Sequence, residues 1–88
     1  MIIGLALFAM ALQAQAAGQT AILHVENMMC GADPHIVQES LTKLKGVEHV
    51  EIALDAKNVI VSFDNAQVSV ADLMTASGAA GYPATVSN

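Results

Sequence analysis

The sequence has no arginine, and three lysines face eight aspartates and glutamates, which gives a net charge of -5 over 88 residues. Affinity for nucleic-acid phosphates depends on clustered lysine and arginine, so the composition argues against a nucleic-acid-binding protein. An acidic chain is also weakly repelled by anionic membrane surfaces. The acidity suits the attraction of cations, although a charge of this size is ordinary for a soluble domain.

Cysteine occurs once, at Cys30, so no disulfide can form within the chain. A thiol oxidoreductase usually needs a second, resolving cysteine, which this chain lacks. The sequence also contains no glycine-rich phosphate loop, no Ser-His-Asp set in a suitable loop context and no evident pair of carboxylates at a pocket. These absences predict a protein that is not an enzyme.

Charge is absent from the N-terminal fifth, where Glu26 is the first charged residue. The apolar run from Ile2 to Leu12 is shorter than the roughly 20 residues that a membrane-spanning helix needs, and it resembles the core of a secretory signal peptide. Ala14-Gln15-Ala16 has the small-x-small form of a cleavage site. We therefore predict a signal peptide over 1–16, a mature domain over 17–88 and a periplasmic location, although the basic residues that usually open a signal peptide are missing. An uncleaved apolar anchor and a wrong start position are the alternatives.

The mature part shows six predicted elements. Alternating apolar residues predict strands over 21–26, 50–54, 59–63 and 84–86. Asp33-Pro34 predicts a helix that Asp33 caps and that Gly46 ends. Ser69 and Asp72 have the spacing of a capping box, which predicts a second helix that Gly78 ends.

This order of elements predicts an α+β fold, a ferredoxin-like βαββαβ sandwich. Two short helices cannot cover both faces of a sheet, so they should pack on one face of a four-stranded antiparallel sheet. The other face should then be open, and it should carry His24, Glu26, His49 and Glu51.

Soft-metal donors gather between the first strand and the first helix. Cys30 lies just before the helix start, where outward-pointing amides and the helix dipole favour a thiolate. A thiolate selects Hg(II), Cu(I), Zn(II) or Cd(II) over hard cations. Met28 and Met29 add thioethers, and Asp33 and His35 add a carboxylate and an imidazole.

Each donor also has an ordinary structural explanation. A lone cysteine is often a small buried apolar residue, or it pairs with another chain. A methionine in the loop can fill the core, helix capping accounts for Asp33, and His35 can be a solvent-exposed helix residue. His24 and His49 are expected as exposed strand residues.

A metal loop in this position resembles the heavy-metal-associated domain family, and in particular its periplasmic mercuric-ion-binding members. The resemblance covers nearly the whole chain, including Gly46-Val47 and the closing Gly81-Tyr82-Pro83. The family's motif is Gly-Met-x-Cys-x-x-Cys, often followed by Pro; here it reads Asn27-Met28-Met29-Cys30-Gly31-Ala32-Asp33-Pro34. The resemblance implies that Cys30 is a ligand, that Met28 supports the loop and that Tyr82 is the aromatic residue near it. Asp33 occupies the place of the second cysteine, and a carboxylate holds a soft ion poorly.

Three consequences of the missing thiol stay open. Cys30 binds one soft ion with help from Met29, His35 or an outside thiol; two molecules share an ion through one Cys30 each; or the site is inactive. The resemblance implies a periplasmic carrier of Hg(II) that passes the ion to an inner-membrane transporter, and a monomer or a dimer bridged by metal or disulfide. A Cu(I) chaperone and an interaction module without metal are the alternatives, and no organic cofactor is expected.

Overall fold

The computed structural model describes residues 18–87, so the predicted signal peptide over 1–16 lies outside the described residues. Seven elements follow one another: β1 (Gly18–His24), α2 (Asp33–Thr42), β2 (Val47–Ala53), the short 3-10 helix η1 (Leu54–Ala56), β3 (Asn58–Asp64), α3 (Val70–Ala79) and β4 (Thr85–Val86). The predicted order of strands and helices is confirmed.

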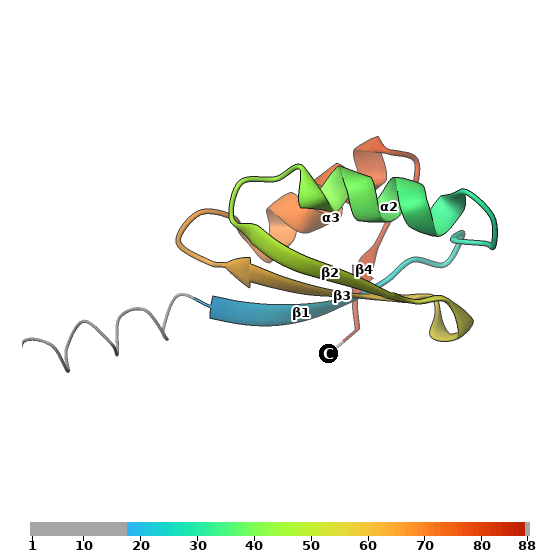
Figure 1. Ribbon diagram of the computed structural model, residues 1–88, viewed down its shortest axis with the longest axis horizontal. Coiled ribbons are helices and arrows are strands. Elements are labelled where there is room, and N and C mark those ends of the chain that lie inside the picture. Colours follow the sequence, from blue (N-terminus) through green and yellow to red (C-terminus); the bar gives the residue numbers. More distant parts are fainter. Residues whose placement is uncertain (1–17, 88) are drawn as a thin grey trace, which may run out of the picture.

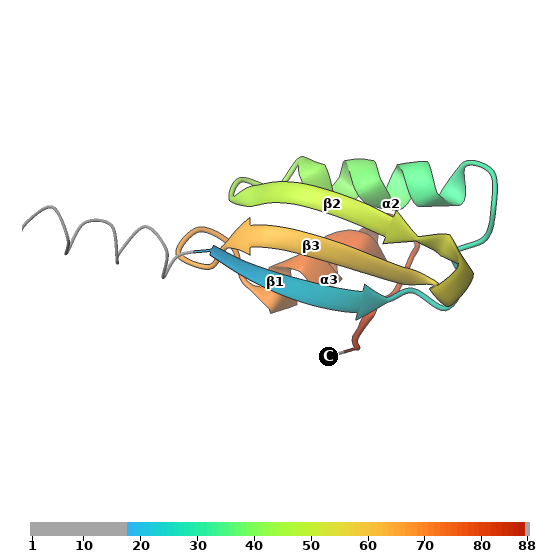
Figure 2. The same ribbon diagram turned by 60° about the horizontal axis from the view of Figure 1, so that its bottom comes forward.

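The strands form one antiparallel sheet in the order β2-β3-β1-β4. Both helices lie on the same side of this sheet, as predicted, and its other side is uncovered within the described part of the chain (Figure 1). Figure 2 shows β1, β3 and β2 side by side on the uncovered side. β4 is at an edge, and Pro83 lies two residues before it, where the missing proline N–H removes no ladder hydrogen bond.

Alternation along the strands places one set of apolar side chains under the helices. In β1, Ala21 and Leu23 are buried while Ile22 and His24 are only partly covered. The fully buried apolar side chains are Leu23, Val25, Met28, Val37, Leu41, Val59, Val61 and Leu73, with Phe63 almost so. On the opposite face Glu26, His49 and Glu51 are exposed and His24 is partly covered, close to the prediction.

The ends of the elements differ from the predictions in several places. β1 begins earlier than expected, at Gly18, because it pairs with the full length of β3 down to Asp64. β2 ends before Leu54, which belongs to the η1 turn. Alternation alone could not reveal these limits, since they depend on the partner strand and on the connecting turn.

Gly46 does not end α2, as the sequence suggested, because the helix stops at Thr42 and the chain makes further turns before β2. Gly46 has a φ of +99°, and a Cβ there would lie 2.8 Å from Cβ of Gln67. This glycine therefore serves the turn into β2 and the close approach of the β3–α3 connection.

The capping box of α3 is confirmed. The Asp72 amide donates to Ser69 Oγ at 3.1 Å, and the Ser69 amide donates to Asp72 Oδ2 at 3.0 Å. The predicted end at Gly78 is wrong, because α3 continues to Ala79. The residue with the left-handed backbone is Gly81, at a φ of +99°, and it turns the chain toward β4.

Candidate metal site

The segment between β1 and α2, residues 25–32, is the candidate metal loop, and it lies at one end of the molecule beside the start of α2 (Figure 1). Two of its residues, Val25 and Met28, are fully buried in the core. Cys30 and Met29 are exposed, Met29 at 59%. The loop is therefore anchored in the core from below and presents the thiol to solvent, so Cys30 is not the buried apolar residue of the ordinary explanation.

Asp33 does not cap α2, which corrects the sequence-based expectation. The N-cap residue is Ala32, and no side chain caps the helix. Asp33 is itself the first helical residue, and side chains there tilt toward the helix start, which directs its carboxylate into the preceding loop. Asp33 Oδ2 accepts the Met29 amide at 2.9 Å, and Oδ1 accepts the Tyr82 hydroxyl at 2.5 Å.

These two hydrogen bonds favour the charged form of Asp33 and the neutral form of Tyr82. The Tyr82 hydroxyl, and after it the Met29 amide, lower the pKa of Asp33 below its ordinary value because both stabilise the carboxylate. The same hydrogen bond raises the pKa of Tyr82, with partial burial of the phenol adding to the effect. At neutral pH, Asp33 is thus a carboxylate with both oxygens engaged.

Tyr82 is held in place by the end of α3. Its amide donates to the Ser77 carbonyl at 2.9 Å, and Ser77 Oγ donates to the Tyr82 carbonyl at 2.5 Å. Ser77 is fully buried. Sequence reasoning placed Ser77 on the inner face of the helix but missed this role; a polar residue at a core position was the available signal, because buried polar groups need partners.

A second contact joins the candidate metal loop to the same turn. Asn27 Nδ2 donates to the Gly81 carbonyl at 3.0 Å. Sequence reasoning treated Asn27 only as a departure from the family's usual glycine. The amide side chain that replaces hydrogen at this position supplies a link that glycine could not make.

His35 is exposed on the first turn of α2, and its Nε2 lies 3.3 Å from Glu39 Oε2, one turn further along the helix. Its contact is therefore with another helix side chain. His24 is on the uncovered sheet face, where hydrogen bonds to Glu26 and Asn58 raise its pKa. Within residues 18–87, no group of three or more His, Cys, Asp or Glu side chains could hold a metal ion together.

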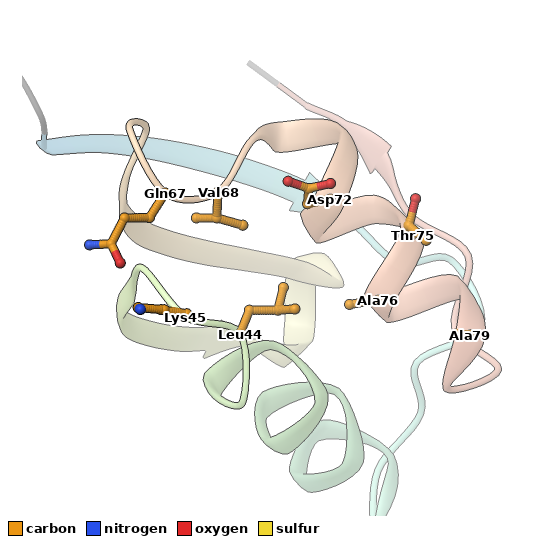
Figure 3. Close-up of a pocket in the computed structure, with 8 residues that line it drawn as sticks. All are labelled: Leu44, Lys45, Gln67, Val68, Asp72, Thr75, Ala76 and Ala79. Carbon is orange, nitrogen blue, oxygen red and sulfur yellow. The ribbon is translucent and has the colours of Figure 1, made fainter.

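A hollow of about 390 Å³ lies away from the candidate metal loop, between α3 and the segment that follows α2 (Figure 3). It is lined by Leu44, Lys45, Gln67, Val68, Asp72, Thr75, Ala76 and Ala79. The lining comes from the segment after α2, the β3–α3 connection and α3, and it includes none of the predicted metal donors.

The chemistry available at the loop is that of one accessible thiol. Cys30 offers a single soft ligand, while the carboxylate of Asp33 is a hard ligand that already accepts two hydrogen bonds. Such a site can form one strong bond to a soft ion and leaves the rest of the coordination sphere open to outside ligands.

Comparison with known proteins agrees with this geometry. Residues 22–83 match the heavy-metal-associated domain. The "mercuric transport protein periplasmic component" of Pseudomonas fluorescens is 39% identical over 84 residues, which cover 96% of this chain and 92% of that protein. No helix in residues 18–87 is long and apolar enough to cross a membrane.

Solved structures agree as well. The crystal structure of oxidized MerP from Ralstonia metallidurans CH34 matches with a TM-score of 0.79 and 38% identity, over 82% of this chain and all of that one. The mercury-bound form of MerP, the periplasmic protein of the bacterial mercury detoxification system, matches with a TM-score of 0.72 at the same identity and coverage. The predicted fold is confirmed, and these relatives are transport and binding proteins rather than enzymes. The chain belongs to the heavy-metal-associated domain family and is related over almost its whole length to the periplasmic mercuric transport proteins.

Proposed function

We propose that this protein is an exported carrier of one soft metal ion, Hg(II) foremost, with residues 1–16 as its signal peptide and 17–88 as its carrier domain. Cys30 is the metal ligand, and the ion passes from it to an inner-membrane transporter in the periplasm. The observation that carries the proposal is the exposed Cys30 thiol, on a loop that the core and the α3–β4 turn hold in place.

A single protein thiolate gives this carrier a particular chemistry. Hg(II) bound to Cys30 takes its second ligand from outside, either a small thiol or a cysteine of another protein. Asp33 is not needed because its two oxygens serve Met29 and Tyr82, and His35 is directed to Glu39 on the helix. In the resulting complex, the bond between mercury and the Cys30 sulfur is the one that this protein supplies.

Transfer then follows from ligand exchange. A thiolate of the transporter attacks the ion and forms a new mercury–sulfur bond, and the bond between mercury and Cys30 breaks. Cys30 leaves as a thiolate and takes a proton from solvent, so no oxidant or reductant is required. A solvent-exposed ligand on an open loop favours this exchange over tight storage.

The test is non-denaturing mass spectrometry of reduced protein with one equivalent of Hg(II) and a competing small thiol, beside the Cys30→Ser variant. His35→Ala is the matched control, because His35 is also exposed near the loop. We expect one ion per monomer or per dimer in the wild type and in His35→Ala, and none in Cys30→Ser. If the wild type holds no ion, the carrier proposal is wrong and an interaction module without metal is favoured. In that case the Cys30→Ser variant would still bind the partner protein.

A further inference from the structure

The candidate metal loop is attached to one turn at two points, on either side of the thiol. Before Cys30, Asn27 donates to the Gly81 carbonyl at 3.0 Å. After it, Asp33 accepts the Tyr82 hydroxyl at 2.5 Å. Residues 81 and 82 are neighbours in the chain, so a single short segment spans the loop and joins both of its ends.

The same segment is fixed to α3 by Ser77. Two hydrogen bonds close between Ser77 and the backbone of Tyr82, one through Ser77 Oγ and one through the Ser77 carbonyl. Ser77 has no exposed surface, so its hydroxyl has no access to water as an alternative partner. This buried serine determines where the Tyr82 backbone lies and, through it, where the phenol reaches Asp33.

The carboxylate completes the connection on the loop side. Asp33 Oδ2 accepts the Met29 amide, the residue directly before Cys30. A continuous path of hydrogen bonds therefore runs from Ser77 through Tyr82 and Asp33 to the backbone beside the thiol. We call the three side chains Ser77, Tyr82 and Asp33 the clasp.

We propose that the clasp positions Cys30, with Tyr82 and Ser77 as positioning residues that act through Asp33 on the backbone of the candidate metal loop. This proposal rests on the proposed function in one respect only, namely that Cys30 binds a metal ion. In this chain Asp33, at the second cysteine position, accepts hydrogen bonds that hold the end of the loop. The Cys30 thiol is therefore presented to solvent from a backbone with a defined conformation.

A purely structural role for the same contacts makes a different prediction. If the clasp contributed only to overall stability, its loss would loosen the sheet and the candidate metal loop together. If it positions the loop, its loss accelerates exchange in the loop more than exchange in the central strands β1 and β3, which open only with the whole fold. Local opening of amides can be distinguished from global unfolding in this way.

The experiment uses Tyr82→Phe and Ser77→Ala in metal-free, reduced protein. Ser40→Ala is the matched control, since Ser40 Oγ likewise donates to a backbone carbonyl, that of Val37, but within α2. Hydrogen exchange is followed at the Met29 and Cys30 amides and at the amides of β1 and β3. The amide order parameter of Cys30 gives an independent measure of loop motion on a faster timescale.

We expect exchange at Met29 to become about tenfold faster in Tyr82→Phe, with a smaller increase in Ser77→Ala, because each removes one hydrogen bond of the path. The order parameter of Cys30 should fall in both variants, and exchange in β1 and β3 should rise less than exchange at Met29. In the Ser40→Ala control, Met29 exchange and the Cys30 order parameter should stay at wild-type values. Unchanged exchange at Met29 in Tyr82→Phe, or an equal acceleration in the loop and the strands, would overturn the proposal. Because no metal is present, this result is independent of whether Cys30 binds Hg(II).

Discussion

Tyr82 donates its phenolic hydrogen to the carboxylate of Asp33, 49 positions earlier in the chain, and thereby closes the end of the candidate metal loop. Asp33 occupies the position where the family's motif has its second cysteine. The carboxylate at this position has a structural role of its own, because it accepts hydrogen bonds from the Tyr82 hydroxyl and from the Met29 amide. The protein thus has a one-thiol loop whose frame is held by the residue that replaced the other thiol.

The first prediction concerns acid pH. The folded protein holds the pKa of Asp33 below its ordinary value of 3.8, so the unfolded chain binds a proton there more readily. The stability that the clasp contributes is then complete above pH 3.8, and it is lost as pH falls through the lower, folded-state pKa. The difference in unfolding free energy between wild type and Tyr82→Phe should therefore be largest near neutral pH and should shrink on acidification.

Urea unfolding of both proteins across the acid range measures this difference. Tyr82 sets the alkaline end of this range. Its pKa is raised in the folded protein, so its contribution to the unfolding free energy is lost only as pH rises above the ordinary value of 10.0. If the difference in unfolding free energy stays constant from neutral pH to well below 3.8, the ionised carboxylate of Asp33 is not what stabilises the clasp.

The second prediction restores the missing thiol. Asp33→Cys places a second thiolate three residues after Cys30, and the second mercury–sulfur bond becomes intramolecular. We expect Hg(II) to be retained roughly a hundredfold or more better against a competing small thiol, since an intramolecular ligand has a high effective concentration. Asp33→Ser is the matched control, because it also removes the carboxylate but adds no sulfur.

Retention is measured on reduced protein by non-denaturing mass spectrometry during titration with the small thiol. If Asp33→Cys retains no more Hg(II) than Asp33→Ser, the limit on binding lies in the geometry of the loop rather than in the absent thiol. The clasp is lost in both variants, so that loss cannot account for a difference between them.

The third prediction separates stability from metal binding. Ser69→Ala removes the side-chain acceptor for the Asp72 amide at the start of α3, and the expected cost is about 1 kcal/mol of unfolding free energy. Ser69 is not part of the clasp or of the candidate metal loop, so Hg(II) retention should stay at the wild-type level. Chemical denaturation and the metal titration, made on the same sample, measure the two quantities; a parallel loss of retention would tie metal binding to overall stability.

Much of the fold was predictable because it depends on local patterns. Alternation in Val59, Val61 and Phe63 indicated β3, and the spacing of Ser69 and Asp72 indicated the start of α3. Helix ends were less predictable, since Gly46 and Gly78 are typical of helix ends but serve a later turn and the last turn of α3. Their roles depend on what the chain packs against afterwards.

The sequence predicted the exposed thiol of the candidate metal loop but not the contacts that hold this loop, and Cys30 as a metal ligand stays a prediction. A thiol, a helix start and a family motif together indicated Cys30. The Asp33-Pro34 pattern assigned Asp33 to helix capping, because a sequence cannot show that Tyr82 approaches from the far end of the chain. Asn27 and Ser77 were missed for the same reason: their partners, Gly81 and Tyr82, are set by the packing of α3 against the sheet.

The central claim is that Cys30 is the protein's one ligand for the ion and that Asp33 is not a ligand. Equilibrium dialysis against Hg(II), with one equivalent of a small thiol, tests it on the wild type, Cys30→Ser and Asp33→Ala. We expect one bound ion for the wild type and for Asp33→Ala, and none for Cys30→Ser. Equal loss of binding in Asp33→Ala and Cys30→Ser, or undiminished binding in Cys30→Ser, would contradict it.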